Sequence, residues 1–490
     1  MLYERTLGQW LEHWATTTPD KEYIVYSDRN LRFTWSQFNR RVDDMAKGLI
    51  AIGVERGTHV GIWAANVPDW LTLQYACAKI GAVYVTVNTN YKQAELEYLC
   101  ENSDMHTLCI VNGEKDSDFV QMTYTMLPEL KNCQRGHLKS ERFPYMKNVI
   151  YVGQEKHRGM YNTSEILLLG NNVEDTRLDE LKSQVSCHDV VNMQYTSGTT
   201  GFPKGVMLTQ NNLASNVEAV KISAEPGTAM LSVLPIHHAF CLVMDWLKGF
   251  SQGATICIND SLLHMVRNMS IFKPDIMLMV PMMIETIYKR LAAADPEIPE
   301  AVLAEKVFGG KLQTIFTGGA HLDPYYIDRF AEYGVEVLEG YGMSECSPVI
   351  SNNTPENHKK GSIGKPLENA EIRFENGEIL VKGSSVMKGY YQMPDETAET
   401  LKDGWLHTGD KGYMDEDGYL FINGRVKNLI ILSNGENVSP EEIENKLALN
   451  PLIGEVIVTG EDNGLTARIY PEQAVVEAKA LDAEAIQAQL

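Results

Sequence analysis

Residues 190–209, VVNMQYTSGTTGFPKGVMLT, predict a loop held between two strands. The flanking segments VVNMQY and GVMLT are apolar and rich in β-branched residues, as strands are. Between them lie four hydroxyl side chains, several glycines, Pro203 and Lys204. The polar groups of this loop are therefore expected together at one end of a strand pair, where a ligand has access.

The loop resembles a phosphate-binding loop in chemistry but not in pattern. A Walker loop reads G-x-x-x-x-G-K-[ST] and leads into a helix, whereas here Pro203 precedes Lys204 and a strand follows. Glycines can turn successive backbone N–H groups to one side, while the hydroxyls and the lysine suit a polyphosphate. A plain Ser/Thr/Gly turn is the alternative. The candidate phosphate-binding residues are Thr196, Ser197, Gly198, Thr199, Thr200 and Lys204.

Strand and helix patterns alternate on both sides of this loop. Residues 34–54 predict a helix with Thr34 as its N-cap, and a strand, a helix and a strand follow at 59–66, 70–82 and 83–88. A second series is expected to begin at Val190 and to run to about residue 351. This alternation predicts an α/β fold with parallel, doubly wound sheets, whose ligands bind beyond the carboxyl ends of the strands.

The pattern changes after residue 361. Short alternating strands separated by Asn376-Gly377 and Asp417-Gly418 predict a small antiparallel, β-barrel-like unit. Beyond residue 425 a strand, a helix with Ser439 as cap and Pro440 at its first position, and another strand predict a small α+β domain. The expected domains are 1–426, with subregions of about 1–188, 189–357 and 358–426, and a C-terminal domain at 427–490.

Composition restricts the partners. The chain has 490 residues, with 43 Lys and Arg against 65 Asp and Glu, so its formal net charge is −22. Such a charge argues against nucleic acid as a partner. None of the eight cysteines forms a C-x-x-C pair, which favours reduced thiols. No signal peptide and no run of about 18 apolar residues is recognisable, so we expect a cytoplasmic protein with at most peripheral membrane contact.

Two further stretches offer groups for a nucleotide. In FTGGAHLDP, residues 316–324, Gly318 and Gly319 permit the close backbone approach that a flat base needs; a tight turn is the alternative. In EGYGMSECSP, residues 339–348, Tyr341 can stack on a base, Ser344 can donate to a phosphate and Glu345 can hold Mg²⁺. The alternative is a loop with a solvated glutamate.

Other candidates come from shorter patterns. In WLHTGD, Asp410 can accept both hydroxyls of a ribose or lead a turn. In INGRVKNLI, Arg425 can bridge ribose and phosphate, or Arg425 and Lys427 are surface charges without a binding role. The adjacent histidines of LPIHHAF have no third ligand at zinc spacing and are either structural or functional. Four methionines either line a tunnel that binds an apolar chain or pack in the core: Met277, Met279, Met282 and Met283.

The motifs YTSGTTGFPKG, TGGA, EGYGMSE, HTGD and GRVKNLIILSNGENVSPEEIE, in this order, resemble the adenylate-forming superfamily. They are most similar to AMP-forming fatty acyl-CoA synthetases, and KNLIILSNGENVSPEEIE together with LPIHHAF looks most like the long-chain branch. The resemblance covers nearly the whole chain. It implies a large N-terminal domain of two doubly wound sheets and a β-barrel-like unit, followed by a small lid domain.

The resemblance also implies a reaction. A fatty acid carboxylate attacks the α-phosphate of ATP to give acyl-AMP and pyrophosphate, and the thiol of CoA then displaces AMP. Mg²⁺ would be held by Glu345 and Thr196, and His238 would lie beside the acyl group. Lys427 would mark the hinge of the lid. The implied nucleotide contacts are the phosphate loop, Gly319, Ala320, Glu339, Gly340, Tyr341, Gly342, Ser344, Asp410 and Arg425, and Gly435 would line the path of CoA.

One departure from the family pattern concerns the C-terminus. Members of the family carry a catalytic lysine there, in a P-x-x-x-x-G-K-type segment. The last lysine of this chain, Lys479, lies in an Ala- and Glu-rich stretch without an adjacent glycine. An incomplete lid is therefore expected, and impaired adenylation is an alternative to the full reaction. The alternatives to a fatty acyl-CoA ligase are a relative that binds nucleotide or acyl-adenylate and an acyl-AMP ligase that feeds a carrier protein.

Overall fold

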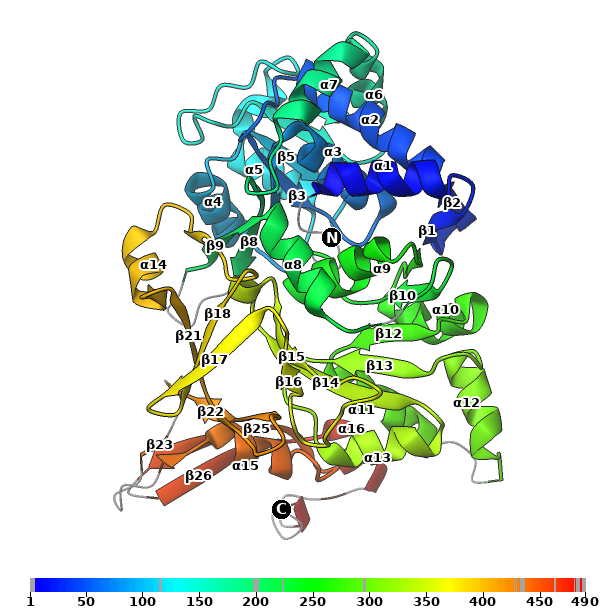
Figure 1. The fold of residues 1–490 in the computed structure, drawn as a ribbon, viewed down its shortest axis with the longest axis vertical. Helices are drawn as coiled ribbons and strands as arrows, with labels where there is room; N and C mark the ends of the chain where they lie inside the picture. Colours follow the sequence, from blue (N-terminus) through cyan, green and yellow to red (C-terminus); the bar gives the residue numbers. More distant parts are fainter. Residues whose placement is uncertain are drawn as a thin grey trace.

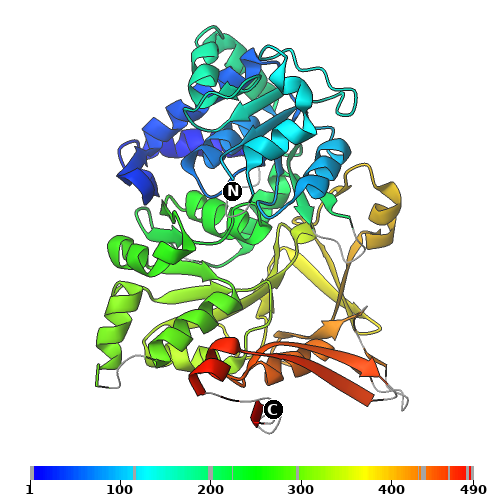
Figure 2. The same cartoon turned by 180° about the vertical axis from the view of Figure 1, so that it is seen from behind.

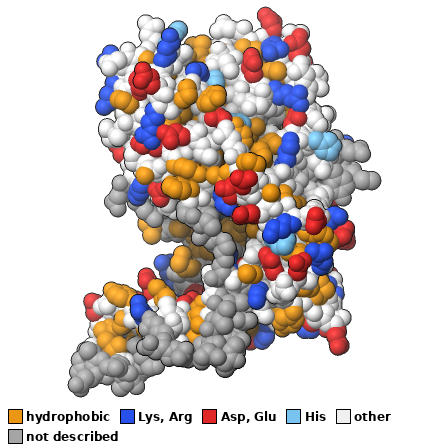
Figure 3. Space-filling model, turned by 90° about the vertical axis from the view of Figure 1, so that its left-hand side faces the viewer, with side chains coloured by type: hydrophobic (Ala, Val, Ile, Leu, Met, Phe, Trp, Pro, Cys, Tyr) orange, Lys and Arg blue, Asp and Glu red, His pale blue; other side chains and the backbone are white. Residues whose placement is uncertain are grey.

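The computed structural model describes residues 5–113, 117–196, 202–222, 224–293, 297–426, 428, 430–431, 437–461, 464–479, 481 and 485–486. Figures 1 and 2 show the first sheet at the top, the second and third sheets beside each other below it, and the C-terminal strands at the bottom. Acidic and basic side chains are interspersed on the face drawn in Figure 3. That face is hollowed above the lowest part of the molecule, which carries the C-terminal strands.

The first sheet has eight strands in the order β19-β9-β8-β4-β3-β5-β6-β7. The strands from β8 to β7 in this order run parallel, and β9 and β19 are antiparallel additions at one edge. The strands are β3 (His59–Trp63), β4 (Val83–Thr86), β5 (Thr107–Ile110), β6 (Asn148–Tyr151), β7 (Tyr161–Asn162), β8 (Val190–Thr196), β9 (Lys204–Thr209) and β19 (Gly389–Tyr390). The helices of this part are α1 (Leu7–Thr17), α2 (Trp35–Ala51), α3 (Pro68–Ile80), α4 (Gln93–Asn102), α5 (Phe119–Met126), α6 (Thr163–Gly170) and α7 (Asp175–Gln184).

The second sheet has nine strands in the order β16-β15-β14-β13-β12-β10-β11-β1-β2. Its central six, from β14 to β1, are parallel. The strands are β1 (Glu22–Tyr26), β2 (Leu31–Thr34), β10 (Ala229–Ser232), β11 (Thr255–Ile258), β12 (Ile276–Met279), β13 (Thr314–Thr317), β14 (Glu336–Gly342), β15 (Val349–Asn352) and β16 (Lys365–Pro366). The helices are α8 (Gln210–Ala219), the π-helix η4 (Phe240–Leu247), α9 (Lys248–Ser251), α10 (Met265–Phe272), α11 (Pro281–Ala292), α12 (Glu300–Phe308) and α13 (Pro324–Glu332).

The two parallel sheets confirm the predicted α/β fold, but they exchange strands. A second series beginning at Val190 was the wrong division, because β8 and β9 complete the first sheet while β1 and β2 close the second. The chain thus starts in the second sheet, builds most of the first and returns. Strand pattern alone does not choose between two such sheets, because both offer parallel edges of similar apolar character.

The third sheet is antiparallel, as its turn pairs predicted. Its strands are β17 (Ala370–Glu375), β18 (Glu378–Gly383), β20 (Leu401–Lys402), β21 (Trp405–Met414) and β22 (Leu420–Arg425), and α14 (Pro394–Thr400) lies beside them. Asn376 and Gly377 both have positive φ, 51° and 80°, and join β17 to β18 in the two-residue turn that an Asn-Gly pair favours.

The C-terminal segment contains β23 (Ile430–Ile431), β24 (Asn437–Val438), α15 (Pro440–Leu447), β25 (Ile453–Glu461), β26 (Gly464–Pro471) and α16 (Gln473–Lys479). Pro440 is at the first position of α15 as predicted. Ser439 stands before it, but its hydroxyl donates to the carboxylate of Glu441 instead of capping a backbone N–H. The Lys446 ammonium of α15 lies 2.9 Å from Asp323 Oδ2, which ties this segment to the start of α13.

Helix α2 begins at the N-cap that the sequence predicted. Thr34 Oγ1 accepts from the Gln37 backbone N–H, and the Gln37 side chain accepts from the Thr34 N–H, so the predicted cap is a reciprocal capping box. The apolar face of α2 is buried against the core, where Trp35 stacks on Tyr23 with ring centroids 3.8 Å apart. All eight cysteines are free and six are buried. Within the described residues, no helix is long and apolar enough to cross a membrane.

Candidate active site

The opening loop lies at the junction of β8 and β9. Thr196 ends β8 opposite Lys204, the first residue of β9, in antiparallel register. The predicted strand–loop–strand unit is therefore confirmed at both flanks. The predicted residues Ser197, Gly198, Thr199, Thr200, Lys427 and Gly435 lie outside the described residues.

A cavity of about 340 Å³ opens where the strands of the second sheet end. Among its lining residues are seven of the predicted site residues, from three separate segments: His238, Gly319, Ala320, Gly340, Tyr341, Gly342 and Ser344. Its position agrees with the rule that ligands bind beyond the carboxyl ends of parallel strands. The sequence therefore found much of one wall of this cavity.

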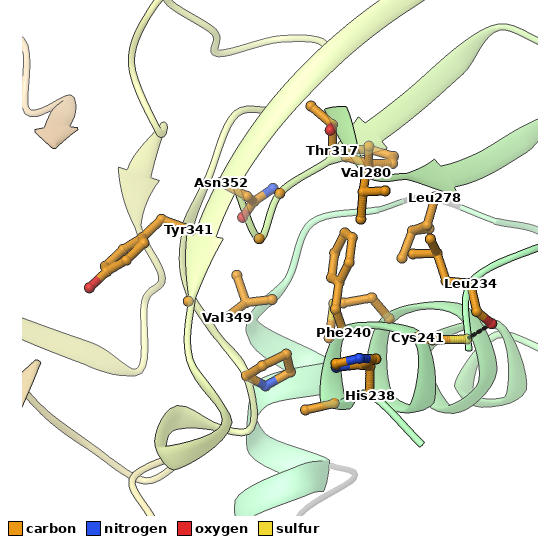
Figure 4. Close-up of a pocket in the computed structure, with 18 of the residues that line it drawn as sticks. Leu234, His238, Phe240, Cys241, Leu278, Val280, Thr317, Tyr341, Val349 and Asn352 are labelled. Atoms are coloured by element: carbon orange, nitrogen blue, oxygen red, sulfur yellow. Dashed lines mark hydrogen bonds between the residues drawn. The ribbon is translucent and has the colours of Figure 1, made fainter. Parts of the chain in front are cut away.

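The opposite wall is apolar and was missed. Figure 4 shows Leu234, Phe240 and Cys241 on one side of the cavity, near Leu278 and Val280 of the β12 region, with Tyr341 on the other side. Leu234 and Phe240 stand at the two ends of LPIHHAF, but nothing in that motif marks them as part of an apolar wall, because a wall assembled from several strand ends and the π-helix η4 leaves no local pattern. Only the helical clustering of Phe240 and Cys241 after the histidine pair was available as a signal.

The methionine hypothesis resolves in favour of the core. Met277 and Met279 are fully buried in β12 and do not line the cavity, whereas Leu278 and Val280 do. Successive side chains of a strand point to opposite faces, so only the alternate set can reach the cavity. Met282 is 71% exposed and also stands outside the lining.

The glycines of TGGA serve close packing and an unusual backbone angle. A Cβ at Gly318 would lie 2.9 Å from the carbonyl oxygen of Gly340, so this position keeps β13 and β14 close together. Gly319 has φ of +82° with open space around it. The chain therefore presents bare backbone to the cavity at this point, which is what a planar ligand can approach.

Tyr341, Asp410 and Arg425 form one hydrogen-bonded group. The Tyr341 hydroxyl donates to Asp410 Oδ2 at 2.6 Å, and Arg425 Nε lies 3.1 Å from Asp410 Oδ1. Asp410 and Arg425 are direct partners in the β21–β22 ladder. Burial raises the pKa of Asp410, while the Tyr341 hydroxyl and the Arg425 guanidinium oppose that rise. The structure thus brings together three predicted residues from distant motifs.

Glu345 is a buried carboxylate in the turn after β14. Its Oε1 accepts a hydrogen bond from the Tyr390 hydroxyl at 2.8 Å. Burial raises the pKa of Glu345, and the Tyr390 hydrogen bond and the charge of Lys204 oppose this. The Lys204 ammonium lies 4.9 Å from the centroid of the Tyr390 ring. Sequence reasoning missed Tyr390, whose segment MKGYYQ carries no recognisable chemical pattern.

Glu339 is a buried carboxylate with one oxygen unpartnered. Its Oε2 has no hydrogen-bond partner, and burial raises the pKa of the side chain to about 7. The backbone N–H of Leu322 partly offsets this by donating to the carboxylate. A buried acceptor without a partner costs folding free energy, which a ligand that donates a hydrogen bond recovers.

The histidine pair divides between two environments. His238 lines the cavity, and burial lowers its pKa. His237 is not among the lining residues, and burial together with His238 lowers its pKa to about 3. Within the described part of the chain no three His, Cys, Asp or Glu side chains gather into a metal-binding group. The chain therefore offers His238 as a neutral polar group beside an apolar wall.

Comparison with known proteins settles the family. The family model described as AMP-binding enzyme matches residues 11–391. This chain belongs to the AMP-binding enzyme family. Within it, the chain is 36% identical to a putative acyl-CoA synthetase of Bacillus subtilis (strain 168), over 94% of this chain and 85% of that protein. It is 30% identical to the mitochondrial medium-chain acyl-CoA ligase ACSF2 of Macaca fascicularis, over 94% and 77%.

The fold of this chain agrees with the folds of solved structures. The structure of the anthranilate CoA ligase AuaEII in complex with anthranoyl-AMP superposes with a TM-score of 0.81 at 20% identity, covering 99% of this chain and 92% of that one. This superposition confirms the α/β fold, while the family model and the 36% identical relative confirm the resemblance to the adenylate-forming superfamily.

Proposed function

We propose that this protein activates a fatty acid with ATP and transfers the acyl group to CoA, giving acyl-CoA, AMP and pyrophosphate. The observation that carries the proposal is a cavity of about 340 Å³ that joins an apolar wall to the glycine-rich wall of TGGA and EGYG. An acyl chain needs the first wall and a nucleotide needs the second. Their junction is where an acyl carboxylate and an α-phosphate can meet.

The nucleotide would lie along the β13–β14 side. Gly319 and Ala320 give backbone access, and Tyr341 contributes an aromatic ring. The unpartnered Oε2 of Glu339 would accept a hydrogen bond from the exocyclic amine of adenine. Gly340 and Gly342 continue the same wall. The ribose hydroxyls would share Asp410, which Arg425 and the Tyr341 hydroxyl already hold in place.

The phosphates would extend from Ser344 toward the β8–β9 loop. Ser344, which lines the cavity, would donate to the α-phosphate, and Lys204 with Thr196 and the loop 197–200 would hold the β- and γ-phosphates. Attack by the carboxylate oxygen forms its bond to the α-phosphorus as the bond to pyrophosphate breaks. Positive charge at Lys204 and fixed donors stabilise the negative charge of this transition state.

The residues present fit Mg²⁺. A buried carboxylate at Glu345 and the Thr196 hydroxyl provide a small number of oxygen donors. Mg²⁺ prefers such a site, in which substrate phosphates and water supply the remaining ligands. Glu345 and Thr196 would hold the ion, which supplies charge neutralisation to the phosphates when bound.

His238 and the apolar wall would bind the acid. A neutral imidazole beside the apolar wall can hold the substrate carboxylate without forming a competing ion pair. In the second step the CoA thiol attacks the acyl carbonyl and AMP leaves. We assign residues 427–490 as the lid, Lys427 as its hinge and Gly435 to the path of CoA. The long-chain branch remains our proposal for the acid.

The test incubates the full chain with ATP, Mg²⁺, CoA and fatty acids of graded length, and measures AMP and acyl-CoA. We expect acid-dependent AMP release that Lys204→Ala reduces at least about a hundredfold. Lys360→Ala is the matched control, because Lys360 pairs with Asp328 on the surface. Absence of AMP with every acid contradicts the proposal. Thioester formation from presynthesised acyl-AMP, without AMP release from ATP, shows that adenylation alone is impaired and rules out a relative that only binds nucleotide or acyl-adenylate.

A further inference from the structure

Residues 387–391, named here the bridging segment, contact two separate parts of the proposed site. The backbone N–H of Met387 donates to the carbonyl of Glu345 at 2.8 Å. The N–H groups of Lys388 and Tyr391 donate to the carbonyls of Met207 and Gly205 at 3.0 and 2.8 Å. The segment contains β19, which pairs with β9. It therefore connects the strand that begins at Lys204 with the turn that carries Glu345.

The side chain of Tyr390 makes the same connection between the two charged groups. Its hydroxyl donates to Glu345 Oε1 at 2.8 Å, and its ring lies 4.9 Å from the Lys204 ammonium. Tyr390 is 6% exposed and Glu345 is 8% exposed. A hydrogen bond to a buried carboxylate and a cation–π contact both restrict rotamers of long, flexible side chains.

The backbone holds this tyrosine in one place. The Tyr390 N–H donates to Thr397 Oγ1 at 2.9 Å. The preceding residue, Gly389, has φ of +143°, and a Cβ there would lie 2.9 Å from Thr397 Cγ2. The glycine thus allows the bridging segment to pack against α14. Because its backbone is fixed from two sides, Tyr390 can fix the side chains that it contacts.

We propose that Tyr390 is a positioning residue for adenylation, whose ring places Lys204 and whose hydroxyl places Glu345. The inference rests on the proposed function, because it assigns those two residues to one polyphosphate and its Mg²⁺. The Tyr390 hydroxyl takes one lone pair of Glu345 Oε1 and so fixes the orientation in which the carboxylate would meet the ion. Lys204 and Glu345 then contact the nucleotide from fixed positions. Binding therefore costs less side-chain conformational entropy.

The two contacts can be separated by substitution. Tyr390→Phe keeps the ring beside Lys204 and removes the hydroxyl from Glu345, whereas Tyr390→Leu removes both. Tyr391→Phe is the matched control, because the Tyr391 hydroxyl donates to Asp104 Oδ2 at 2.8 Å, away from the cavity. ATP affinity is measured by titration calorimetry on the full chain, once with Mg²⁺ and once with EDTA.

We expect Tyr390→Phe to weaken ATP binding about tenfold with Mg²⁺, and less than about twofold with EDTA. Tyr390→Leu weakens binding under both conditions, and Tyr391→Phe under neither. In the pyrophosphate-release assay, Tyr390→Phe also raises the half-saturating Mg²⁺ concentration. If Tyr390 had only a structural role, Tyr390→Phe would instead lower stability and would change ATP affinity equally with Mg²⁺ and with EDTA.

Two results would overturn the inference while leaving the proposed function intact. One is wild-type protein that binds ATP and releases AMP while Tyr390→Phe matches Tyr391→Phe in both titrations. The other is a Tyr390→Phe effect that is equal with Mg²⁺ and EDTA. Wild-type protein that neither binds ATP nor releases AMP rejects the proposed function itself. Tyr390→Phe preserves the packed ring. It therefore tests the contribution of the hydroxyl contact with Glu345 even if Tyr390→Leu does not fold.

Discussion

Replacing Glu339 by glutamine should change how the stability of this protein depends on pH. Glu339 is 7% exposed, and its pKa rises from the ordinary value of 4.5 to about 7 because burial disfavours the charged form. The folded chain therefore keeps this proton to a higher pH than the unfolded chain does. Stability contributed by the neutral form is complete below about pH 4.5 and is lost as pH rises toward 7.

The size of the effect follows from the shift. A shift of this size corresponds to about 3 kcal/mol of unfolding free energy. The entropy of unfolding of about 2 cal/mol/K per residue gives roughly 1 kcal/mol/K for a chain of 490 residues that unfolds as one unit. Glutamine is neutral at every pH and does not suffer the loss. Glu339→Gln should therefore raise Tm by about 3 °C at pH 8 and leave it unchanged at pH 4.5.

Differential scanning calorimetry of both proteins at pH 4.5, 6 and 8 measures this difference. Glu336→Gln is the control, because Glu336 lies on the same strand with a side chain 36% exposed. Glu336→Gln removes one negative charge, but that charge is not buried in the wild-type protein. The reasoning is refuted if the Tm difference between Glu339→Gln and wild type is the same at all three pH values, or if Glu336→Gln shows the same pH dependence.

Three further changes test other parts of the structure. Val280→Phe should shorten the longest acid that supports AMP release, since Val280 lines the apolar wall; an unchanged chain-length profile would contradict that placement. Arg425→Ala should raise the half-saturating ATP concentration by about three- to tenfold, the modest range expected for a half-exposed partner of the buried Asp410, and unchanged ATP kinetics would argue against it. Thr34→Ala should cost about 1 kcal/mol by removing the capping box with Gln37, seen as a Tm lower by about 1 °C with unaltered turnover, and a loss of activity would show a role beyond the cap.

Local signals were readable wherever neighbouring residues decide the structure. The capping box at Thr34, the Asn376-Gly377 turn and the strand–loop–strand around 190–209 involve residues close together in sequence. Backbone propensity and hydrogen bonds over a few residues determine them, so a pattern search finds them. The exchange of β1 and β8 between the sheets was not readable, because it depends on edges built by distant segments.

The same division holds at the candidate site. By itself the sequence determined which polar and glycine-rich segments carry the chemistry, since Lys204, Gly319, Tyr341 and Glu345 stand in short ordered motifs. Only the tertiary structure decided what lies opposite and between them: the apolar wall of the cavity, and Tyr390 between Lys204 and Glu345. The physical reason is that such contacts come from packing of side chains across strands far apart in sequence, where the choice of face and partner leaves no local pattern.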